Sequence, residues 1–229
     1  KRDGPDSNPF HGLCVAHASN PQAVDWDGDG DLDLVLGARD GGVLYLERLP
    51  NSSLRLRGPD LNPFHGIHVG RHSVPRAVDW DGDGDLDLIL GAGDDCLRLH
   101  YYERLSDRSL QKRDGPDSNP FHGLCVAHAS NPQAVDWDGD GDLDLVLGAR
   151  DGGVLYLERL PNSSLRLRGP DLNPFHGIHV GRHSVPRAVD WDGDGDLDLI
   201  LGAGDDCLRL HYYERLSDRS LQKRDGPDS

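Results

Sequence analysis

Aspartates recur at alternate positions of one short segment of this sequence. Residues 25–33 read DWDGDGDLD, so carboxylates occupy positions 1, 3, 5, 7 and 9 of a nine-residue stretch. Alternating carboxylates in a tight loop converge on one point, and hard oxygen ligands in this number suit Ca²⁺ better than the smaller Mg²⁺. Glycine at position 6 permits a sharp turn, and position 7 ordinarily offers its backbone carbonyl. The pattern predicts a calcium loop.

The same nine residues occur four times, which argues against a polar turn that is merely rich in Asp and Gly. Unlike an EF-hand, the loop lacks a Glu at position 12 and runs directly into a strand pattern. Without a cation, five carboxylates within nine residues would repel one another, so binding is expected to be coupled to folding. About one Ca²⁺ per loop is predicted. The candidate metal residues are Asp25, Asp27, Asp29, Asp31, Asp33, Asp79, Asp81, Asp83, Asp85, Asp87, Asp136, Asp138, Asp140, Asp142, Asp144, Asp190, Asp192, Asp194, Asp196 and Asp198.

The overall charge fits a cation ligand better than a polyanionic partner. The 229 residues carry a net charge of −16, and the four loops hold half of the 40 acidic residues. Phosphate binding needs clustered Lys and Arg, so a nucleic-acid partner is not expected. No apolar run reaches the roughly 18 residues that a membrane helix needs.

An internal repeat governs the organisation of the chain. Residues 1–111 recur unchanged as 112–222, and 223–229 begin a third copy. Each 111-residue period consists of two related halves, type A and type B. The predicted units are 4–57 (A), 58–114 (B), 115–168 (A) and 169–225 (B).

Each unit has the pattern of short strands. Ala23 and Val24 lead into the Asp loop, and Leu32, Leu34 and Leu36 then alternate with other residues, which predicts a strand with one buried face. A Gly-Gly pair at 41–42 predicts a hairpin, with a return strand at 43–46 and an edge strand at 54–56. The fold class is therefore all-β: four four-stranded blades in tandem, either closed into a propeller or part of a continuous array.

The string Pro-x-Ala-Val-Asp-x-Asp-Gly-Asp-Gly-Asp-Leu-Asp-Leu-x-Leu-Gly resembles the FG-GAP/VCBS repeat, the blade motif of integrin α-subunit propellers. The Asn-Pro-Phe-x-Gly segments at 8–12 and 62–66 also resemble the linker between VCBS-type units. The resemblance implies calcium loops with ligands at Asp25, Asp27, Asp29 and Asp33, and at the three matching sets. Four units are fewer than the seven common in the family, which leaves ring closure or a continuous array open.

Two further residue types suggest an extracellular protein. Asn51-Ser52-Ser53 and its copy at Asn162 are N-glycosylation sequons in predicted exposed turns. Of the four cysteines, Cys96 and Cys125 are predicted to form a disulfide across the period boundary, which leaves Cys14 and Cys207 for neighbouring repeats. A Cys14–Cys96 bridge and free buried thiols are the alternatives.

Other polar and aromatic residues are interpreted as structural. His65, His68 and His72 are expected on the surface, and the tryptophan at loop position 2, such as Trp26, is expected to pack between neighbouring units. An exposed aromatic pair, Tyr101 and Tyr102, would serve a sugar-binding protein.

Because identical copies suit a mechanical array, the leading hypothesis is a calcium-stabilised extracellular protein with a structural or adhesive role, as a segment of a filament or surface stalk. Its expected partners are further identical repeats, with glycans or surface proteins as other possibilities. The alternatives are a lectin-like glycan-binding propeller and an engineered symmetric propeller. No asymmetric cluster of acid, base and nucleophile is present, so the chain is not expected to be an enzyme.

Overall fold

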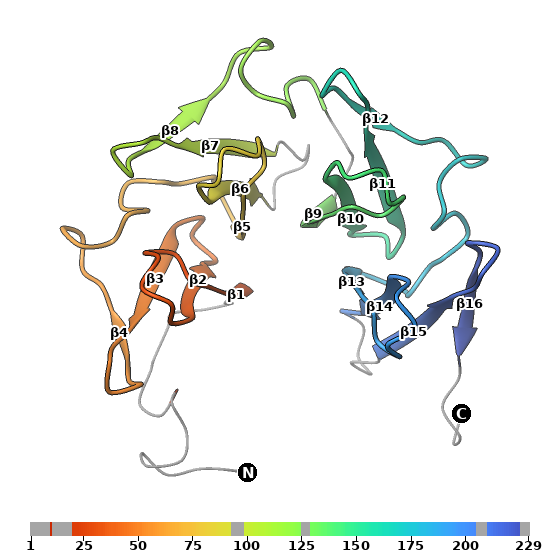
Figure 1. Cartoon of the computed structure of the whole chain (residues 1–229), viewed down its shortest axis with the longest axis horizontal. Helices are drawn as coiled ribbons and strands as arrows, with labels where there is room; N and C mark the ends of the chain where they lie inside the picture. The colour runs from red at the N-terminus through yellow and green to blue at the C-terminus, as the bar shows by residue number, and fades with distance from the viewer. Residues whose placement is uncertain (1–9, 11–19, 93–98, 125–128, 205–209, 225–229) are drawn as a thin grey trace. The chain divides into compact units, whose positions relative to one another are not determined.

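The computed structural model describes residues 10, 20–92, 99–124, 129–204 and 210–224, and Figure 1 labels its strands. All of the assigned secondary structure in these residues is β, in four antiparallel sheets of four strands each. The prediction of an all-β fold built from four-stranded blades is confirmed. The strands are β1 (Asn20–Val24), β2 (Asp33–Gly37), β3 (Val43–Arg48), β4 (Leu54–Leu56), β5 (Val74–Val78), β6 (Asp87–Gly91), β7 (His100–Arg104), β8 (Leu110–Arg113), β9 (Ala129–Val135), β10 (Asp144–Ala149), β11 (Val154–Arg159), β12 (Leu165–Leu167), β13 (Val185–Val189), β14 (Asp198–Gly202), β15 (Leu210–Arg215) and β16 (Leu221–Arg224).

Every sheet is a meander in which each strand pairs with the next one along the chain, as β1-β2-β3-β4 does in the first sheet. The first two strands pair in register from Asn20 opposite Gly37 to Val24 opposite Asp33, so the Asp loop closes this pair at one end. Each sheet lies within one of the predicted units, whose boundaries stay predictions.

The hairpin between β2 and β3 turns at the Gly-Gly pair. Gly41 has a φ of 94°, and a Cβ there would come within 2.6 Å of the Gly70 carbonyl oxygen. A side chain at this position would meet both a strained backbone conformation and a steric clash, because the segment that leads to the next sheet passes close by.

The second strand is more deeply buried than its leucine alternation predicts. Val35 is completely buried, whereas Leu32 is 54% exposed and Leu34 is only partly buried. The expectation of one buried face is therefore wrong: β2 is covered on both faces, as in a sheet stacked between other layers.

The chain divides into two compact units, one with β1–β8 and the other with β9–β16. In the first unit β1 and β2 contact β5, and in the second β9 and β10 contact β13. Each unit therefore has its own apolar core between a type A sheet and a type B sheet. Ring closure versus a continuous array stays a prediction, since both chain ends lie outside the described residues.

Candidate calcium loops

Each Asp loop joins the first and second strands of its sheet and is shaped by its own side chains. In the loop between β1 and β2, Asp25 Oδ1 accepts a hydrogen bond from the Gly28 amide at 2.8 Å, and Oδ2 accepts one from the Gly30 amide at 2.9 Å. Gly28 and Gly30 have φ values of 79° and 93°, in the left-handed region that favours glycine. The two glycines thus allow the loop to wrap around the first carboxylate.

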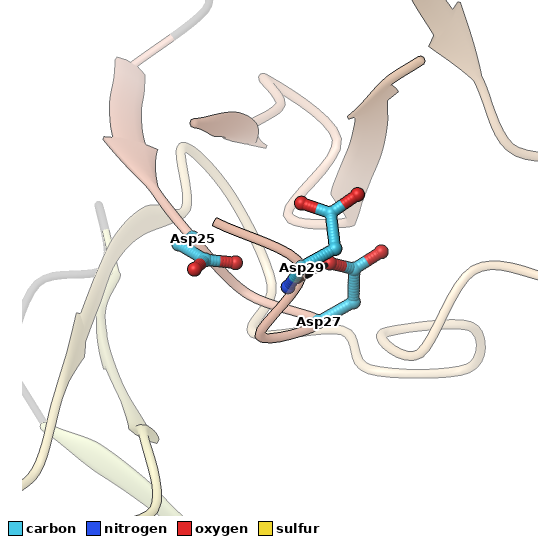
Figure 2. Close-up of side chains that lie close together, drawn as sticks. All are labelled: Asp25, Asp27 and Asp29. Atoms are coloured by element: carbon cyan, nitrogen blue, oxygen red, sulfur yellow. Dashed lines mark hydrogen bonds between the residues drawn. The ribbon is translucent and has the colours of Figure 1, made fainter. Parts of the chain in front are cut away.

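The next two carboxylates continue this pattern. Asp27 Oδ1 accepts from the Asp29 amide at 3.1 Å, and Asp29 Oδ1 accepts from the Asp31 amide at 2.9 Å. Figure 2 shows the side chains of Asp25, Asp27 and Asp29 gathered at this loop. Backbone donors therefore fix one oxygen of Asp27 and one oxygen of Asp29.

All four loops bring three carboxylates together, with ligand atoms within 4.8 Å of one another. Positions 1, 3 and 5 form this group in three loops, and positions 1, 3 and 9 form it in the loop between β9 and β10. Position 7 belongs to none of these groups among the described residues. The four groups are Asp25, Asp27 and Asp29; Asp79, Asp81 and Asp83; Asp136, Asp138 and Asp144; and Asp190, Asp192 and Asp194.

The aspartate at position 9 also accepts hydrogen bonds from the sheet, which the loop pattern alone did not indicate. Asp33 is 1% exposed and lies at the start of β2. Its Oδ2 accepts from the Tyr45 hydroxyl at 2.6 Å and from the Trp26 amide at 3.2 Å, and its Oδ1 accepts from the Arg48 amide at 2.8 Å. This carboxylate therefore ties the loop to the end of β3. The equivalent bonds recur at Asp87, Asp144 and Asp198.

Two of the loop carboxylates, Asp27 and Asp87, are in an environment that favours their protonated form. Burial raises the pKa of Asp27 above its ordinary value, and the charges of neighbouring acids raise it further. The hydrogen bond from the Asp29 amide acts in the opposite direction and lowers this pKa. Burial also raises the pKa of Asp87 to about 6, although the Arg104 amide and the Tyr101 hydroxyl stabilise its charge. A nearby cation would relieve this cost, because it favours the ionised carboxylates.

Arg104 of the next sheet and Phe64, which precedes that sheet, both pack against the loop residue Trp26. The guanidinium of Arg104 lies 4.7 Å from the ring centroid of Trp26, and its Nη1 donates to the Trp26 carbonyl at 2.9 Å. Phe64 packs on the same indole, with ring centroids 4.6 Å apart. Trp26 is 3% exposed, so the interpretation of the loop tryptophans as packing between units is confirmed for Trp26, whereas it is wrong for Trp191, which is 66% exposed. The sequence gives one signal for Arg104: a Glu-Arg-Leu triplet recurs at the end of each return strand.

The other predicted residues have mixed outcomes. Asn51 and Asn162 lie in exposed turns, where each side-chain oxygen accepts from the backbone and hydroxyl of the second following Ser. Tyr101 and Tyr102 are 3% and 7% exposed, so the expectation of an exposed aromatic pair is wrong. Tyr101 instead donates to Asp87.

The histidine and cysteine predictions have different outcomes. His65, His68 and His72 are exposed, as expected. Cys14, Cys96, Cys125 and Cys207 lie outside the described residues, so their pairing stays a prediction.

Four meander sheets, each with an Asp loop between its first two strands, define an all-β repeat protein of the propeller-blade type. The FG-GAP-like repeat family matches residues 25–90 and 136–201, which together make up more than half of the chain. The chain belongs to this family, as the resemblance in its sequence implied.

A solved structure that this chain partly resembles is that of a lectin from Agrocybe aegerita. That structure is described as the basis of specific recognition of non-reducing terminal N-acetylglucosamine by the lectin. The two chains share 15% identity with a TM-score of 0.49, over 93% of this chain and 53% of the lectin. This chain thus spans about half the length of the lectin structure. The sugar recognition is a property of the lectin.

Proposed function

We propose that this chain is a calcium-stabilised extracellular repeat protein with a structural or adhesive role. The observation that carries the proposal is the trio of carboxylates in each of the four loops, with ligand atoms within 4.8 Å of one another. Like charges at such separations repel strongly, and a divalent cation with oxygen ligands would convert that repulsion into attraction. Positions 1, 3 and 5 would bind the ion, together with the backbone carbonyl of position 7 and the nearby carboxylate of position 9.

The extracellular location follows from the metal and is supported by the turns. Free Ca²⁺ is abundant outside cells, and Asn51 and Asn162 lie in exposed turns that a glycosylating enzyme can reach. No helix in the described part of the chain is long and apolar enough to cross a membrane.

A structural or adhesive role is supported by the exact repeat. Copies of 111 identical residues give every period the same loops and the same sheet-to-sheet contacts, which suits an array that bears load or presents many equal sites. Further identical repeats are the proposed partners, with glycans or surface proteins next, and we propose no catalytic activity. The lectin-like alternative is weakened, because Tyr101 and Tyr102, which would have bound a sugar as an exposed aromatic pair, are buried.

Calcium removal tests the proposal. Each site that binds only the folded state contributes roughly 2.7 kcal/mol at a hundredfold excess over Kd. Addition of EDTA is expected to lower the melting temperature by tens of degrees or to unfold the chain, and added Ca²⁺ is expected to restore it with about four ions bound. Magnesium at the same concentration is the control, and it should restore little. A melting curve that neither EDTA nor Ca²⁺ changes would refute the calcium site.

A further inference from the structure

A hollow lined by basic residues lies in the second unit, between a hairpin of its first sheet and the segment that leads into its second sheet. The hollow has a volume of about 510 Å³, and it is lined by Arg150, Asp151, Gly181, Arg182 and His183. The first two residues belong to the hairpin between β10 and β11, and the other three precede β13. Two guanidinium groups and one carboxylate line this basic hollow, so it is positively charged in a chain whose net charge is −16.

Hydrogen bonds hold the two arginine-bearing segments together. The His183 amide donates to the Arg150 carbonyl at 3.0 Å, and the Ser184 amide donates to the Ala149 carbonyl at 3.0 Å. The buried Ser184 adds a side-chain link, because its Oγ accepts from the Ala149 amide at 2.8 Å. The backbone that carries both arginines is therefore fixed before any ligand binds, which reduces the freedom lost on binding.

The fourth sheet holds the other side of the same segment. The Gly204 amide, just after β14, donates to the Arg182 carbonyl at 2.8 Å. A Cβ at Gly204 would come within 2.9 Å of the His183 Cβ, so this glycine leaves room for the histidine. His183 has a φ of 50°, in the left-handed region that is uncommon for a residue with a side chain. The basic hollow thus has a defined backbone on both sides.

The first unit repeats the arrangement. Arg39, Arg71 and His72 are exposed there, as their counterparts in the second unit are. The His72 amide donates to the Arg39 carbonyl at 3.0 Å, and the φ of His72 is again 50°. In the described part of the chain, Arg39, Arg71, Arg150 and Arg182 form no ion pair. Their charges are therefore available to a ligand.

The two arginines are not required by the blade pattern. The type B hairpin has Gly93 where the type A hairpin has Arg39, and β6 and β7 still pair. The segment that leads into a type A sheet has His17 where the segment that leads into a type B sheet has Arg71. Both arginines are thus present only on the two segments that meet inside a unit, which favours a role for the pair itself.

The basic hollow is separated from the acidic loop of the same sheet. β10 begins at Asp144, the last residue of its Asp loop, and ends at Ala149, directly before Arg150. A strand of this length spans roughly 20 Å. That distance is more than twice the Debye length of about 8 Å at physiological ionic strength. The carboxylates at the far end of β10 therefore repel an anion in the hollow only weakly.

The lining residues select the class of ligand. A guanidinium group pairs with the planar or tetrahedral oxygens of a carboxylate or sulfate through parallel hydrogen bonds, and an imidazole has an N–H to donate. Ionised Asp151 can only accept hydrogen bonds, which suits hydroxyl groups, and its Oδ1 is fixed by the Gly153 amide at 3.0 Å. A ligand with both an oxyanion and hydroxyl groups satisfies all of these residues.

We propose that the basic hollow binds an acidic saccharide, with Arg150 and Arg182 on its sulfate or carboxylate group and Asp151 on a neighbouring hydroxyl. The matching residues of the first unit bind a second molecule, so that each 111-residue period has one site. Repeated sites in one array strengthen the attachment of a ligand that each site binds weakly. The inference rests on the adhesive role proposed above, for which it names the class of glycan.

Calorimetric titration of the full chain in Ca²⁺ tests the proposal with three probes. These are a sulfated heparin disaccharide, the corresponding unsulfated uronic-acid disaccharide and a neutral N-acetylglucosamine disaccharide. The sulfated probe is expected to bind at two sites per chain, and the neutral probe is expected not to bind over the same range. Binding of the sulfated probe alone would assign the sulfate as the recognised group, whereas binding of both acidic probes would assign the carboxylate. Failure of both acidic probes, or equal binding of the neutral one, would overturn the inference.

Two double variants remove one arginine from each unit, and a third removes two exposed arginines of β4 and β12 as the matched control with the same net charge. They are Arg39→Gln with Arg150→Gln, Arg71→Gln with Arg182→Gln, and the control Arg55→Gln with Arg166→Gln. Each of the first two should weaken binding of the acidic probe about tenfold or more. The control should weaken it less than about twofold, because distant exposed charges are screened. Circular dichroism verifies folding, and unchanged affinity in both hollow variants, or an equal loss in the control, would overturn the inference.

The calcium proposal can fail separately from this inference. Calcium-dependent melting without binding of an acidic probe would leave the calcium loops intact and refute the basic hollow. Binding of an acidic probe by a chain whose melting curve Ca²⁺ does not change would have the opposite meaning.

Discussion

In the loop between β1 and β2, Asp25 and Asp33 carry the same carboxylate in very different surroundings. Asp25 is partly exposed and accepts only from amides of the loop itself, at Gly28 and Gly30. Asp33 is 1% exposed and accepts from the Tyr45 hydroxyl on β3, as well as from two backbone amides. The first carboxylate shapes a loop that a cation would fill, whereas the second joins the loop to the sheet without needing a cation.

The comparison shows that an Asp-rich motif does not assign one role to all of its members. Position 9 begins a strand, so its side chain is fixed by sheet geometry and packs inward. Positions 1, 3 and 5 precede the strand, and their side chains gather around the turn. Three variants and one change of pH test this difference between position 9 and positions 1, 3 and 5.

The largest expected effect is that of Asp33→Ala. The substitution leaves the Trp26 amide, the Arg48 amide and the Tyr45 hydroxyl without their acceptor, and an unsatisfied buried donor costs about 1–3 kcal/mol. The free energy of unfolding in urea with EDTA should fall by about 3 kcal/mol or more. Asp31→Ala, outside the carboxylate groups, is the control and should change it by less than about 0.5 kcal/mol. Equal losses in both variants would contradict the division.

Asp25→Asn is expected to act mainly through the metal. The amide oxygen can still accept from a loop amide, but the charge that would hold the cation is gone. Calorimetric titration should find one bound Ca²⁺ fewer, and the stabilisation by Ca²⁺ should fall by roughly 2.7 kcal/mol at a hundredfold excess over Kd. In EDTA the variant should lose no more than about 1 kcal/mol of stability, because one of the two exposed loop amides loses its acceptor. A large loss of stability in EDTA would mean that position 1 is as structural as position 9.

Tyr45→Phe is expected to have an intermediate effect. It removes the hydroxyl that donates to Asp33 at 2.6 Å but keeps the ring that packs against Phe64. A hydrogen bond to a charged group contributes about 1.5–3 kcal/mol, so the free energy of unfolding should fall by about 1.5 kcal/mol, at the lower end of that range. The number of bound Ca²⁺ should stay unchanged. Loss of one Ca²⁺ would show that calcium binding depends on the Tyr45 hydroxyl as well as on the loop.

The smallest expected effects are two pH dependences of opposite sign, one of calcium binding and one of the stability without calcium. Burial raises the pKa of Asp27, so protons compete with Ca²⁺, and acidification from pH 7 to 5 should weaken calcium binding. The pKa of Asp87 is raised to about 6, so in EDTA its protonation favours the folded state. That contribution is present below its unfolded pKa near 4 and is lost as the pH rises through 6.

Melting curves at pH 5 and 7 measure this second contribution. In EDTA, the wild type should gain a few degrees relative to Asp87→Asn on acidification, because only the wild type can take up the proton. A wild type that loses stability relative to Asp87→Asn over the same interval would show that the charged form of Asp87 is the favoured one.

Much of the local structure could be predicted from the residues themselves. The Asp-Gly spacing determines the loop, because Asp25 accepts from Gly28 and Gly30 and only glycine easily adopts their left-handed φ. The Gly-Gly pair, the alternating leucines and the short polar turn likewise predict the hairpin, the second strand and the edge strand. These features depend on contacts within a few residues, and the Asp loop occurs four times and the Gly-Gly pair twice in the sequence.

What covers each face was decided only by the tertiary structure. Leucine alternation predicted one buried face for β2, but Val35 on the other face is fully buried, and Tyr101, expected to be exposed, donates to a buried carboxylate. A strand pattern fixes which side chains share a face, whereas burial depends on whether another layer lies against that face, which no local pattern encodes.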